Sequence, residues 1–417
     1  MNRLRTRIAI IGAGIGGLSL ALECHARGLS CQVFEAAPEL APLGVGINVL
    51  PHSVRILSRL GLLDELKASA IETAELAFYN RHGQLIWREP RGIAAGYDFP
   101  QLSIHRGELQ MILLKAVQSR LGRGAVLTGH LLESFSTGDE ERLACATLAT
   151  RNGPVQVEAD VLVAADGIHS TARSRLYPDE GPPVFSGRLL WRGTCMAPVF
   201  LTGRSMIQAG HARQKAVIYP IQRDQSTGTG MNLTNWIMEL AVDGGAPPRQ
   251  DWNRRVDKSV FAPRFANWRW PWLNVPELIE RGGEAFEFPM CDRDPLPRWT
   301  FGRTTLLGDA AHPMYPIGSN GASQAILDAE CLVESLVSES NEMTALATYE
   351  SIRRPATAQI VLANRGNGPD QVMQIAEERA PEGFEDIEAV IPRVELESIA
   401  ARYKQTAGFT REQVNRR

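Results

Sequence analysis

Residues 8–17 read IAIIGAGIGG, and this stretch decides the fold of the chain. The apolar run from Arg7 to Ile11 stops at glycine, as central strands of parallel sheets do. A helix is predicted over Gly14–Gly28 and a second buried strand over Cys31–Glu35. Strand, glycine turn, helix and strand in close succession form the opening of a βαβ unit.

The glycine pattern predicts a dinucleotide site. Gly12 allows the tight turn, Gly14 lets a pyrophosphate approach the backbone, and Gly17 lets the helix pack closely on the strand. Free N–H groups at the helix N-terminus bind phosphate charge. Glu35, at the end of the second strand, suits a ribose without a 2′-phosphate, which indicates FAD or NAD and disfavours NADP. A glycine-rich turn of no function is the alternative interpretation.

Composition limits the kind of partner. The 417 residues carry 44 Lys and Arg against 47 Asp and Glu, a net charge of −3, so nothing indicates nucleic acid as a partner. At about 150 residues per domain, two to three domains are expected. The six cysteines are scattered without a C-x-x-C pair, which predicts free thiols and neither a disulfide framework nor a metal site.

The N-terminus resembles a signal peptide in one respect, because arginines precede the apolar stretch Ile8–Leu22. That stretch carries four glycines and ends at Glu23. It is also shorter than the roughly 20 residues that a membrane span requires. We interpret it as a buried strand and helix of a cytoplasmic protein that has no membrane partner.

Further along the chain, the pattern changes twice. Helices are predicted from Pro51 to Leu60, over Arg106–Leu121 and over Ala322–Ser335, with buried strands at Val161–Ala165 and Thr304–Leu307. Between them, strands of an antiparallel sheet are predicted at Leu189–Met196, Lys215–Ile221, Met231–Leu240 and Ala285–Pro289. The predicted fold is α/β: a Rossmann-like domain of residues 1–75, 101–182 and 290–364, an inserted β-sheet substrate domain of 76–100 and 183–289, and a helical tail of 365–417.

Two further motifs place aspartates after predicted strands. Asp166-Gly167 follows one strand, and Gly308-Asp309 follows another and leads to the helix that begins near Asn320. An aspartate at a strand end can bind ribityl hydroxyls, and N–H groups at a helix start can stabilise negative charge on a flavin pyrimidine ring. A capped turn without function explains either motif taken alone.

Together these motifs resemble the single-component, p-hydroxybenzoate hydroxylase-like family of FAD-dependent aromatic hydroxylases. The glycine fingerprint, Asp-Gly and Gly-Asp occur in the order found in that family. Three stretches resemble its phenazine-hydroxylating branch: PLGVGIN at 42–48, SIHRGELQ at 103–110 and DRDPLP at 292–297. The resemblance covers nearly the whole chain except the C-terminal tail.

The resemblance implies a set of FAD contacts. The adenosine and pyrophosphate half is expected at Gly12, Gly14, Gly17, Glu35 and Leu132, and the flavin half at Gly46, Ile47, Arg106, Asp166, Asp309, Gly321 and Ala322. Within this set, Leu132 meets adenine through its backbone, Arg106 reaches the phosphate and ribityl groups, and Asp166 is linked to both FAD and nicotinamide binding.

The resemblance also implies the reaction. NADH or NADPH binds transiently and reduces FAD, and a flavin C4a-hydroperoxide hydroxylates an electron-rich aromatic or heteroaromatic ring, phenazine-like, with or without decarboxylation, in secondary metabolism. No side chain is assigned as catalytic, because the cofactor carries the chemistry. Candidate pocket residues are Trp191, Arg192, Tyr219 and Pro316, and a substrate carboxylate is one partner for Arg192. Oligomeric state stays open.

Three other functions compete with this one. A flavin-dependent dehydrogenase and a Baeyer–Villiger-type oxidase use the same kind of fold, and a flavin-free scaffold such as the Rab GDP-dissociation inhibitors keeps it without the cofactor. The stretch WRWPW at 268–272 resembles part of a halogenase signature but lacks its flanking residues. We interpret these tryptophans as aromatic packing between domains.

Overall fold

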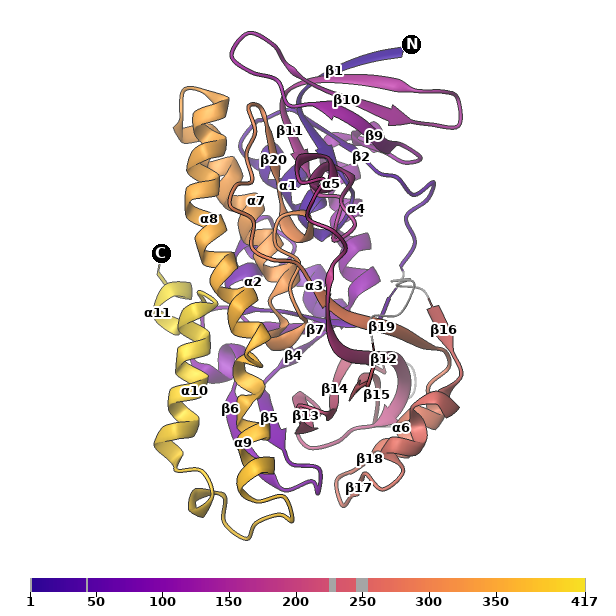
Figure 1. The fold of residues 1–417 in the computed structure, drawn as a ribbon, viewed down its shortest axis with the longest axis vertical. Helices are drawn as coiled ribbons and strands as arrows, with labels where there is room; N and C mark the ends of the chain where they lie inside the picture. Colours follow the sequence, from indigo (N-terminus) through magenta and orange to yellow (C-terminus); the bar gives the residue numbers. More distant parts are fainter. Residues whose placement is uncertain (1, 43, 225–229, 245–253, 417) are drawn as a thin grey trace.

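The computed structural model describes residues 2–42, 44–224, 230–244 and 254–416, so Leu43 of the PLGVGIN stretch lies outside it. Two large sheets dominate the chain, with the N-terminal one in the upper half of Figure 1 and the inserted one in the lower half. The upper sheet has the order β8 (Val126–Leu127), β2 (Cys31–Phe34), β1 (Asn2–Ile11), β11 (Val155–Ala164), β10 (Ala144–Ala149) and β9 (Leu131–Ser136), and β20 (Thr304–Leu306) pairs with β11.

The centre of this sheet is the predicted βαβ unit. Strand β1 lies parallel between β2 and β11, and Ile8–Ile10 are almost fully buried. The helix after it is α1 (Ile15–Ala26), which begins at Ile15 because Gly14 is extended, and which ends before the predicted Gly28. Helix α1 packs against α4 (Arg106–Leu121) and α7 (Gly321–Ser338).

Chain segments from both ends build this domain together, as the sequence predicted. Strand β20 is parallel to β11, although about 140 residues separate them. Helix α7 and the long α8 (Glu342–Arg365), which the sequence analysis did not identify, pack beside each other. The antiparallel strands β9 and β10 were not predicted either. The fold class is therefore confirmed, whereas the individual domain boundaries stay a prediction.

The inserted sheet has eight strands, antiparallel except for the parallel pair β13–β5. Their order is β16 (Arg254–Val256), β19 (Ala285–Asp292), β12 (Val184–Pro198), β15 (Met231–Ala241), β14 (Gln214–Arg223), β13 (Ser205–His211), β5 (Glu75–Tyr79) and β6 (Leu85–Pro90). All four predicted strands are present, and each is longer than predicted.

A third, smaller sheet of β3 (Gly46–Val49), β7 (Gln101–His105) and β4 (Ala70–Thr73) carries Gly46. The helices α2 (Pro51–Arg59) and α3 (Leu63–Ser69) connect β3 to β4.

The two faces of the eight-stranded sheet have different neighbours. Its outer face packs against the hairpin β17–β18 (Arg269–Trp270, Leu273–Asn274) and α6 (Val275–Arg281). Trp268 and Trp270 lie in this core with Phe265, so the prediction that the WRWPW tryptophans pack between domains is wrong. The opposite face of the sheet, the inner face, packs against Tyr315 and Ile317.

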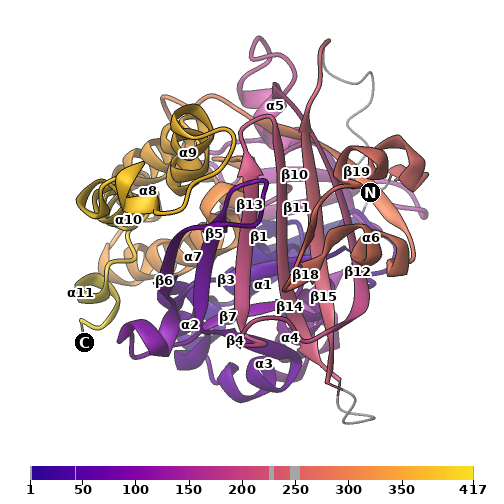
Figure 2. The same ribbon diagram turned by 90° about the horizontal axis from the view of Figure 1, so that it is seen from below.

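The C-terminal tail is helical, as predicted. Its helices are α9 (Gln371–Arg379), α10 (Arg393–Thr406) and α11 (Arg411–Val414), drawn in yellow beside β5 and β6 in Figure 2. Val372, Met373 and Leu396 pack with Leu76 and Met206 of the inner face. The tail therefore covers part of the same face that meets the Tyr315 loop. None of the helices formed by the described residues has the length and apolarity to span a bilayer.

Candidate active site

Four loops leave the upper sheet at the same edge. Strands β1, β2, β11 and β20 are parallel, and their carboxyl ends are followed by Gly12, Glu35, Asp166 and Asp309. Ligands of open α/β sheets bind at this edge. The sheet topology thus gathers four residues that the sequence analysis selected independently.

Glu35 holds the glycine turn in place. Its carboxylate accepts hydrogen bonds from the N–H of Ala13 and of Ala37, both at 2.8 Å. Gly12 has a φ of +106°, and a Cβ there would lie 2.4 Å from the Ala165 carbonyl oxygen. A side chain at position 12 would therefore separate the turn from the end of β11.

Gly14 borders open space. A Cβ built on it has no heavy atom within 4 Å, and no side chain caps the N-terminus of α1 that it begins. Gly17, in contrast, packs so closely that a Cβ would lie 2.0 Å from the Gly12 oxygen. An empty region in front of uncapped helix N–H groups fits a pyrophosphate.

Asp166 and Asp309 supply two carboxylates at the edge. Asp166 accepts a hydrogen bond from the Ala172 N–H at 3.2 Å through Oδ2, while its Oδ1 is buried without a partner. Burial raises the pKa of both aspartates. The side chain of Asp309 is exposed although protein surrounds it closely enough to desolvate it, which is the environment of a concave surface. The unpartnered Oδ1 of Asp166 and the carboxylate of Asp309 can both accept hydrogen bonds from the hydroxyl groups of FAD.

The flavin half is expected where three segments meet. A Cβ on Gly321 would lie 4.0 Å from Asp309 Oδ1, and Gly321 begins α7, whose N-terminus no side chain caps. The Arg106 N–H donates to the Val45 carbonyl at 2.9 Å, and the Arg106 charge acts on Asp309. Gly321 therefore lies beside Asp309, and Arg106, which binds Val45 next to Gly46, is near enough for its charge to oppose the rise in the pKa of Asp309.

Leu132 lies on the other side of the site. Its side chain is buried, and it follows two residues after His130, whose N–H donates to the Glu35 carbonyl at 2.8 Å. This position is next to the end of β2, where a ribose at Glu35 would carry its base. The backbone contact to adenine stays a prediction.

The inner face of the inserted sheet meets this edge at Gly46. The Gly46 N–H donates to Asn235 Oδ1 of β15 at 2.7 Å, and a Cβ on Gly46 would lie 2.7 Å from Asn235 Cβ. Asn235 pairs with Tyr219 on β14 and with Thr194 on β12. Because side chains alternate along a strand, Thr194 and Arg192 share this face.

Arg192 lacks a carboxylate partner. It forms no ion pair with any carboxylate in the described parts of the chain, and its Nε is buried without an acceptor. Its guanidinium lies over the Phe288 ring, 5.2 Å from the centroid. Burial lowers the pKa of Arg192 and raises that of Tyr219. The electrostatic interaction between the two groups opposes both shifts. An unpaired, partly desolvated cation is costly, so a carboxylate supplied by a ligand would stabilise it.

The prediction that Trp191 lines the pocket is wrong. Trp191 projects to the outer face, where its ring stacks on Phe261 at 5.1 Å and its Nε1 donates to Glu287 at 3.0 Å. Pro316 is exposed, and its two neighbours in the loop, Tyr315 and Ile317, pack on the inner face. Arg192, Tyr219 and Pro316 therefore stay candidates, and Trp191 does not.

Two groups of the site were not identified from the sequence. Asn235 belongs to no sequence motif, and its hydrogen bond with Gly46 and its pairing with Tyr219 are seen only in the folded structure. His312 Nε2 lies 2.5 Å from Asp328 Oδ2 of α7, and Asp328 also accepts hydrogen bonds from Arg353 at 2.7 Å and from the Gly308 N–H at 3.1 Å. This cluster fixes the Gly308-Asp309 turn. Among the described residues, no group of three or more His, Cys, Asp or Glu side chains could hold a metal ion.

Comparisons with known proteins agree on one family. Residues 5–183 and 291–364 match the family described as FAD binding domain. The phenazine 1,6-dicarboxylic acid hydroxylase PhzS of Lysobacter antibioticus is 46% identical over 365 residues, which cover 87% of this chain and 89% of that protein. The 3-amino-4-hydroxybenzoate 2-monooxygenase PtmB3 of Streptomyces platensis is 33% identical over 378 residues, 87% of this chain and 88% of that one.

Solved structures share the fold. Klebsiella pneumoniae HpxO, crystallised with FAD and uric acid, superposes with a TM-score of 0.71 over 98% of this chain and 95% of its own, at 22% sequence identity. The similarity in architecture therefore extends to the inserted sheet and the C-terminal tail.

Proposed function

The chain belongs to the FAD binding domain family and is an FAD-dependent aromatic monooxygenase, and from this premise we propose that its substrate is a planar aromatic carboxylate of the phenazine class. The unpaired guanidinium of Arg192 on the inner face carries the proposal. The phenazine class is suggested by the relative PhzS, whose name gives a phenazine dicarboxylic acid as its substrate.

Each group of the site has one task in this proposal. Gly14 and the start of α1 receive the pyrophosphate, Glu35 accepts from the adenosine ribose, and the carboxylates of Asp166 and Asp309 accept from hydroxyl groups of the flavin half. N–H groups at the start of α7 stabilise negative charge on the pyrimidine ring. Bound FAD, with NADH or NADPH and O2 as co-substrates, supplies the oxidative chemistry.

The substrate is held from the sheet side. Arg192 binds the carboxylate and fixes the orientation of the ring, while Phe288, Tyr315 and Ile317 supply an apolar wall that excludes water. Water exclusion matters because a dry site strengthens the ion pair with Arg192 and suppresses side reactions with water. The protein thus contributes the orientation of the substrate and the exclusion of water from the site.

A substrate panel tests the proposal. Flavin bleaching by NADH and by NADPH is followed without oxygen in the presence of phenazine carboxylates, their carboxamides and hydroxybenzoates. We expect the carboxylates of phenazine to accelerate bleaching at least about tenfold over the carboxamides, because only they pair with Arg192. In oxygen, the product must carry one atom from labelled O2.

Other outcomes decide between the competing functions. Oxygen consumption without incorporation of label would indicate a dehydrogenase or a simple oxidase, whereas label in an ester or lactone would indicate Baeyer–Villiger-type oxygen insertion. Equal stimulation by carboxylates and carboxamides would refute the assigned task of Arg192. Mass analysis of the product also shows whether the carboxylate is lost during hydroxylation.

Gly14→Ala is expected to weaken FAD binding without unfolding the protein. The backbone at Gly14 has ordinary angles, φ −71° and ψ −178°, and the new Cβ meets nothing in the protein, so the fold tolerates it. The same Cβ enters the space assigned to the pyrophosphate, and we expect at least about a tenfold higher FAD dissociation constant. Titration of the apoprotein with FAD measures it.

Gly124→Ala is the matched control. A Cβ there also meets no atom within 4 Å, and position 124 lies outside the proposed site. This variant should bind FAD like the parent protein. Equal affinity in the Gly14 variant would show that the pyrophosphate does not lie at the glycine turn.

A further inference from the structure

The loop that leads into α7 has an unfavourable backbone. It contains the short helix η6 (Ile317–Ser319), in which Gly318 has a φ of +68° and Ser319 a φ of +58°. The left-handed region suits glycine but costs a serine conformational free energy. Contacts with the rest of the protein must therefore hold the loop in this shape.

Those contacts converge on Tyr403 of the C-terminal tail. Its hydroxyl accepts a hydrogen bond from Asn320 Nδ2 at 2.9 Å and lies 3.1 Å from the Ile317 carbonyl and 2.8 Å from Asn364 Oδ1, to one of which it donates. Tyr403, Asn320 and Asn364 are all buried. One phenol thus joins α10, α8 and the loop.

The two asparagines extend this network along the loop. Asn364 Nδ2 donates to the Tyr315 carbonyl at 3.1 Å, and Asn320 Nδ2 also donates to the Gly318 carbonyl at 3.1 Å. The loop is consequently fixed at both ends, from Tyr315 to the residue that precedes α7. At its middle, a Cβ on Gly318 would lie 2.0 Å from the Tyr403 hydroxyl, so the phenol approaches the backbone directly.

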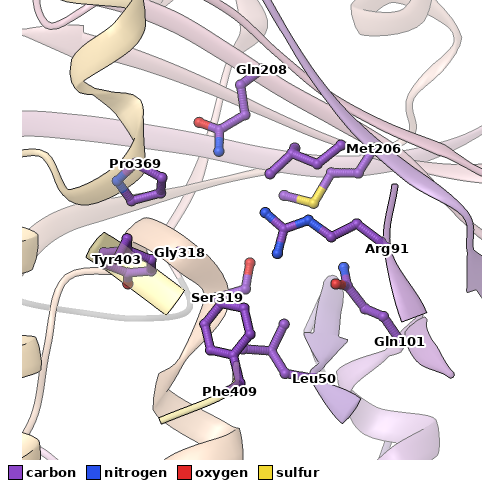
Figure 3. A pocket seen from close by; sticks show the side chains of 11 residues that line it. Leu50, Arg91, Gln101, Met206, Gln208, Gly318, Ser319, Pro369, Tyr403 and Phe409 are labelled. Atoms are coloured by element: carbon purple, nitrogen blue, oxygen red, sulfur yellow. The ribbon is translucent and has the colours of Figure 1, made fainter. Parts of the chain in front are cut away.

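The opposite side of the loop is not held in this way. Ser319 faces a cavity of about 20 Å³, enough for a single water molecule, shown in Figure 3. Arg91 Nε, Gln101 Oε1 and Gln208 Oε1 around this cavity are buried without hydrogen-bond partners. No hydrogen bond among the described residues involves the Ser319 hydroxyl. The Tyr403 network therefore supplies the side-chain hydrogen bonds that hold the loop, beside the apolar packing of Tyr315 and Ile317 on the sheet.

We propose that the C-terminal tail shapes the flavin site indirectly, with Tyr403 as a positioning residue that sets the loop 315–320 and hence the start of α7. This inference rests on the proposed placement of the flavin ring at Gly321 and Ala322. The tail acts only through the loop, since Tyr403 bonds to Ile317 and Asn320 and not to Gly321.

Tyr403→Phe tests the proposal. The ring that packs against Phe409 is kept, and only the hydroxyl is removed. We expect the FAD dissociation constant to rise about threefold to tenfold, the visible absorption bands of bound FAD to shift, and a larger share of NAD(P)H oxidation to yield peroxide instead of hydroxylated product. Titration, absorption spectra and peroxide assays measure the three effects.

Tyr97→Phe is the matched control. The Tyr97 hydroxyl also ties the tail to the rest of the chain, by donating to the Phe409 carbonyl at 2.6 Å, but it does not touch the loop. We expect this variant to keep the parental FAD affinity, spectrum and peroxide yield. Equal changes in both tyrosine variants would show a general effect of loosening the tail and would overturn the proposal.

A third variant distinguishes a failure of the task assigned to Tyr403 from a failure of the proposed flavin site. Asp309→Ala removes a carboxylate of the proposed flavin site itself. If Tyr403→Phe has no effect while Asp309→Ala weakens FAD binding, the positioning task of Tyr403 is refuted and the proposed site stands. If both variants bind FAD normally, the placement of the flavin at this edge is wrong, and the inference is refuted with it.

Discussion

Arg192→Met is expected to lower kcat/KM for a carboxylated aromatic substrate by about a hundredfold to a thousandfold. This loss corresponds to about 3–4 kcal/mol, the usual effect of removing one partner of a buried, hydrogen-bonded charge pair. Methionine keeps an apolar stem of similar length over Phe288, so the wall of the pocket is preserved. Steady-state kinetics with the best carboxylate of the panel measures the effect.

The matched carboxamide gives the sharper comparison. It should lose little activity in the Arg192 variant, because it cannot form the ion pair in the parent protein either. Arg213→Met serves as the control, since Arg213 is exposed at the turn between β13 and β14 and pairs only loosely with Asp243, at 3.8 Å. A variant that still prefers the acid over the amide as strongly as the parent would exclude Arg192 as the carboxylate site.

Asp328→Asn is expected to lower the free energy of unfolding by about 3–5 kcal/mol, because it leaves the buried charge of Arg353 without its partner. Asp328 is fully buried and also binds His312 and the Gly308 N–H. Urea denaturation of the apoprotein measures the change. Glu334→Gln on the same helix is the control, since its ion pair with Arg27 is long, 4.0 Å, and exposed, and we expect a change within about 0.5 kcal/mol.

Acid should remove most of the difference in unfolding free energy between the parent protein and the Asp328→Asn variant. Burial by itself would raise the pKa of Asp328, but His312 and Arg353 lower it to about 2. An aspartate whose pKa is lower in the folded than in the unfolded state stabilises the protein above the unfolded value, about 3.9. That stabilisation is lost as the pH falls towards 2. If the parent protein and the Asp328→Asn variant differ in stability as much near the acid end of this range as at neutral pH, the effect does not have an ionic origin.

The sequence alone predicted the parts of the fold that depend on local geometry. Gly12 adopts a φ of +106°, which favours glycine, and a Cβ on Gly17 would collide with the backbone of Gly12, so both constraints act within a few residues. The alternation and length of apolar runs likewise identified both sheets. The sequence pattern did not identify β9, β10 or α8, because the burial of these elements depends on partners far along the chain.

The error at Trp191 was avoidable in part. Neighbouring residues of one strand point to opposite faces, so Trp191 and Arg192 could not line the same wall. Which of the two faces meets the carboxyl edge of the upper sheet, however, depends on how the eight-stranded sheet packs against the Tyr315 loop. Local pattern fixes the alternation, and tertiary packing assigns the faces.

What the sequence by itself determined is the βαβ unit, the glycine turn and the acidic residues that follow the strands, because each of these depends on backbone conformation within a short segment. Only the tertiary structure decided that Asn235 binds Gly46 across 189 residues and that Tyr403 holds the loop at Ile317 across 86. Polar side chains of this kind leave no periodic signal. Their partners are set by burial, which forces each donor and acceptor to find a match wherever packing brings one within reach.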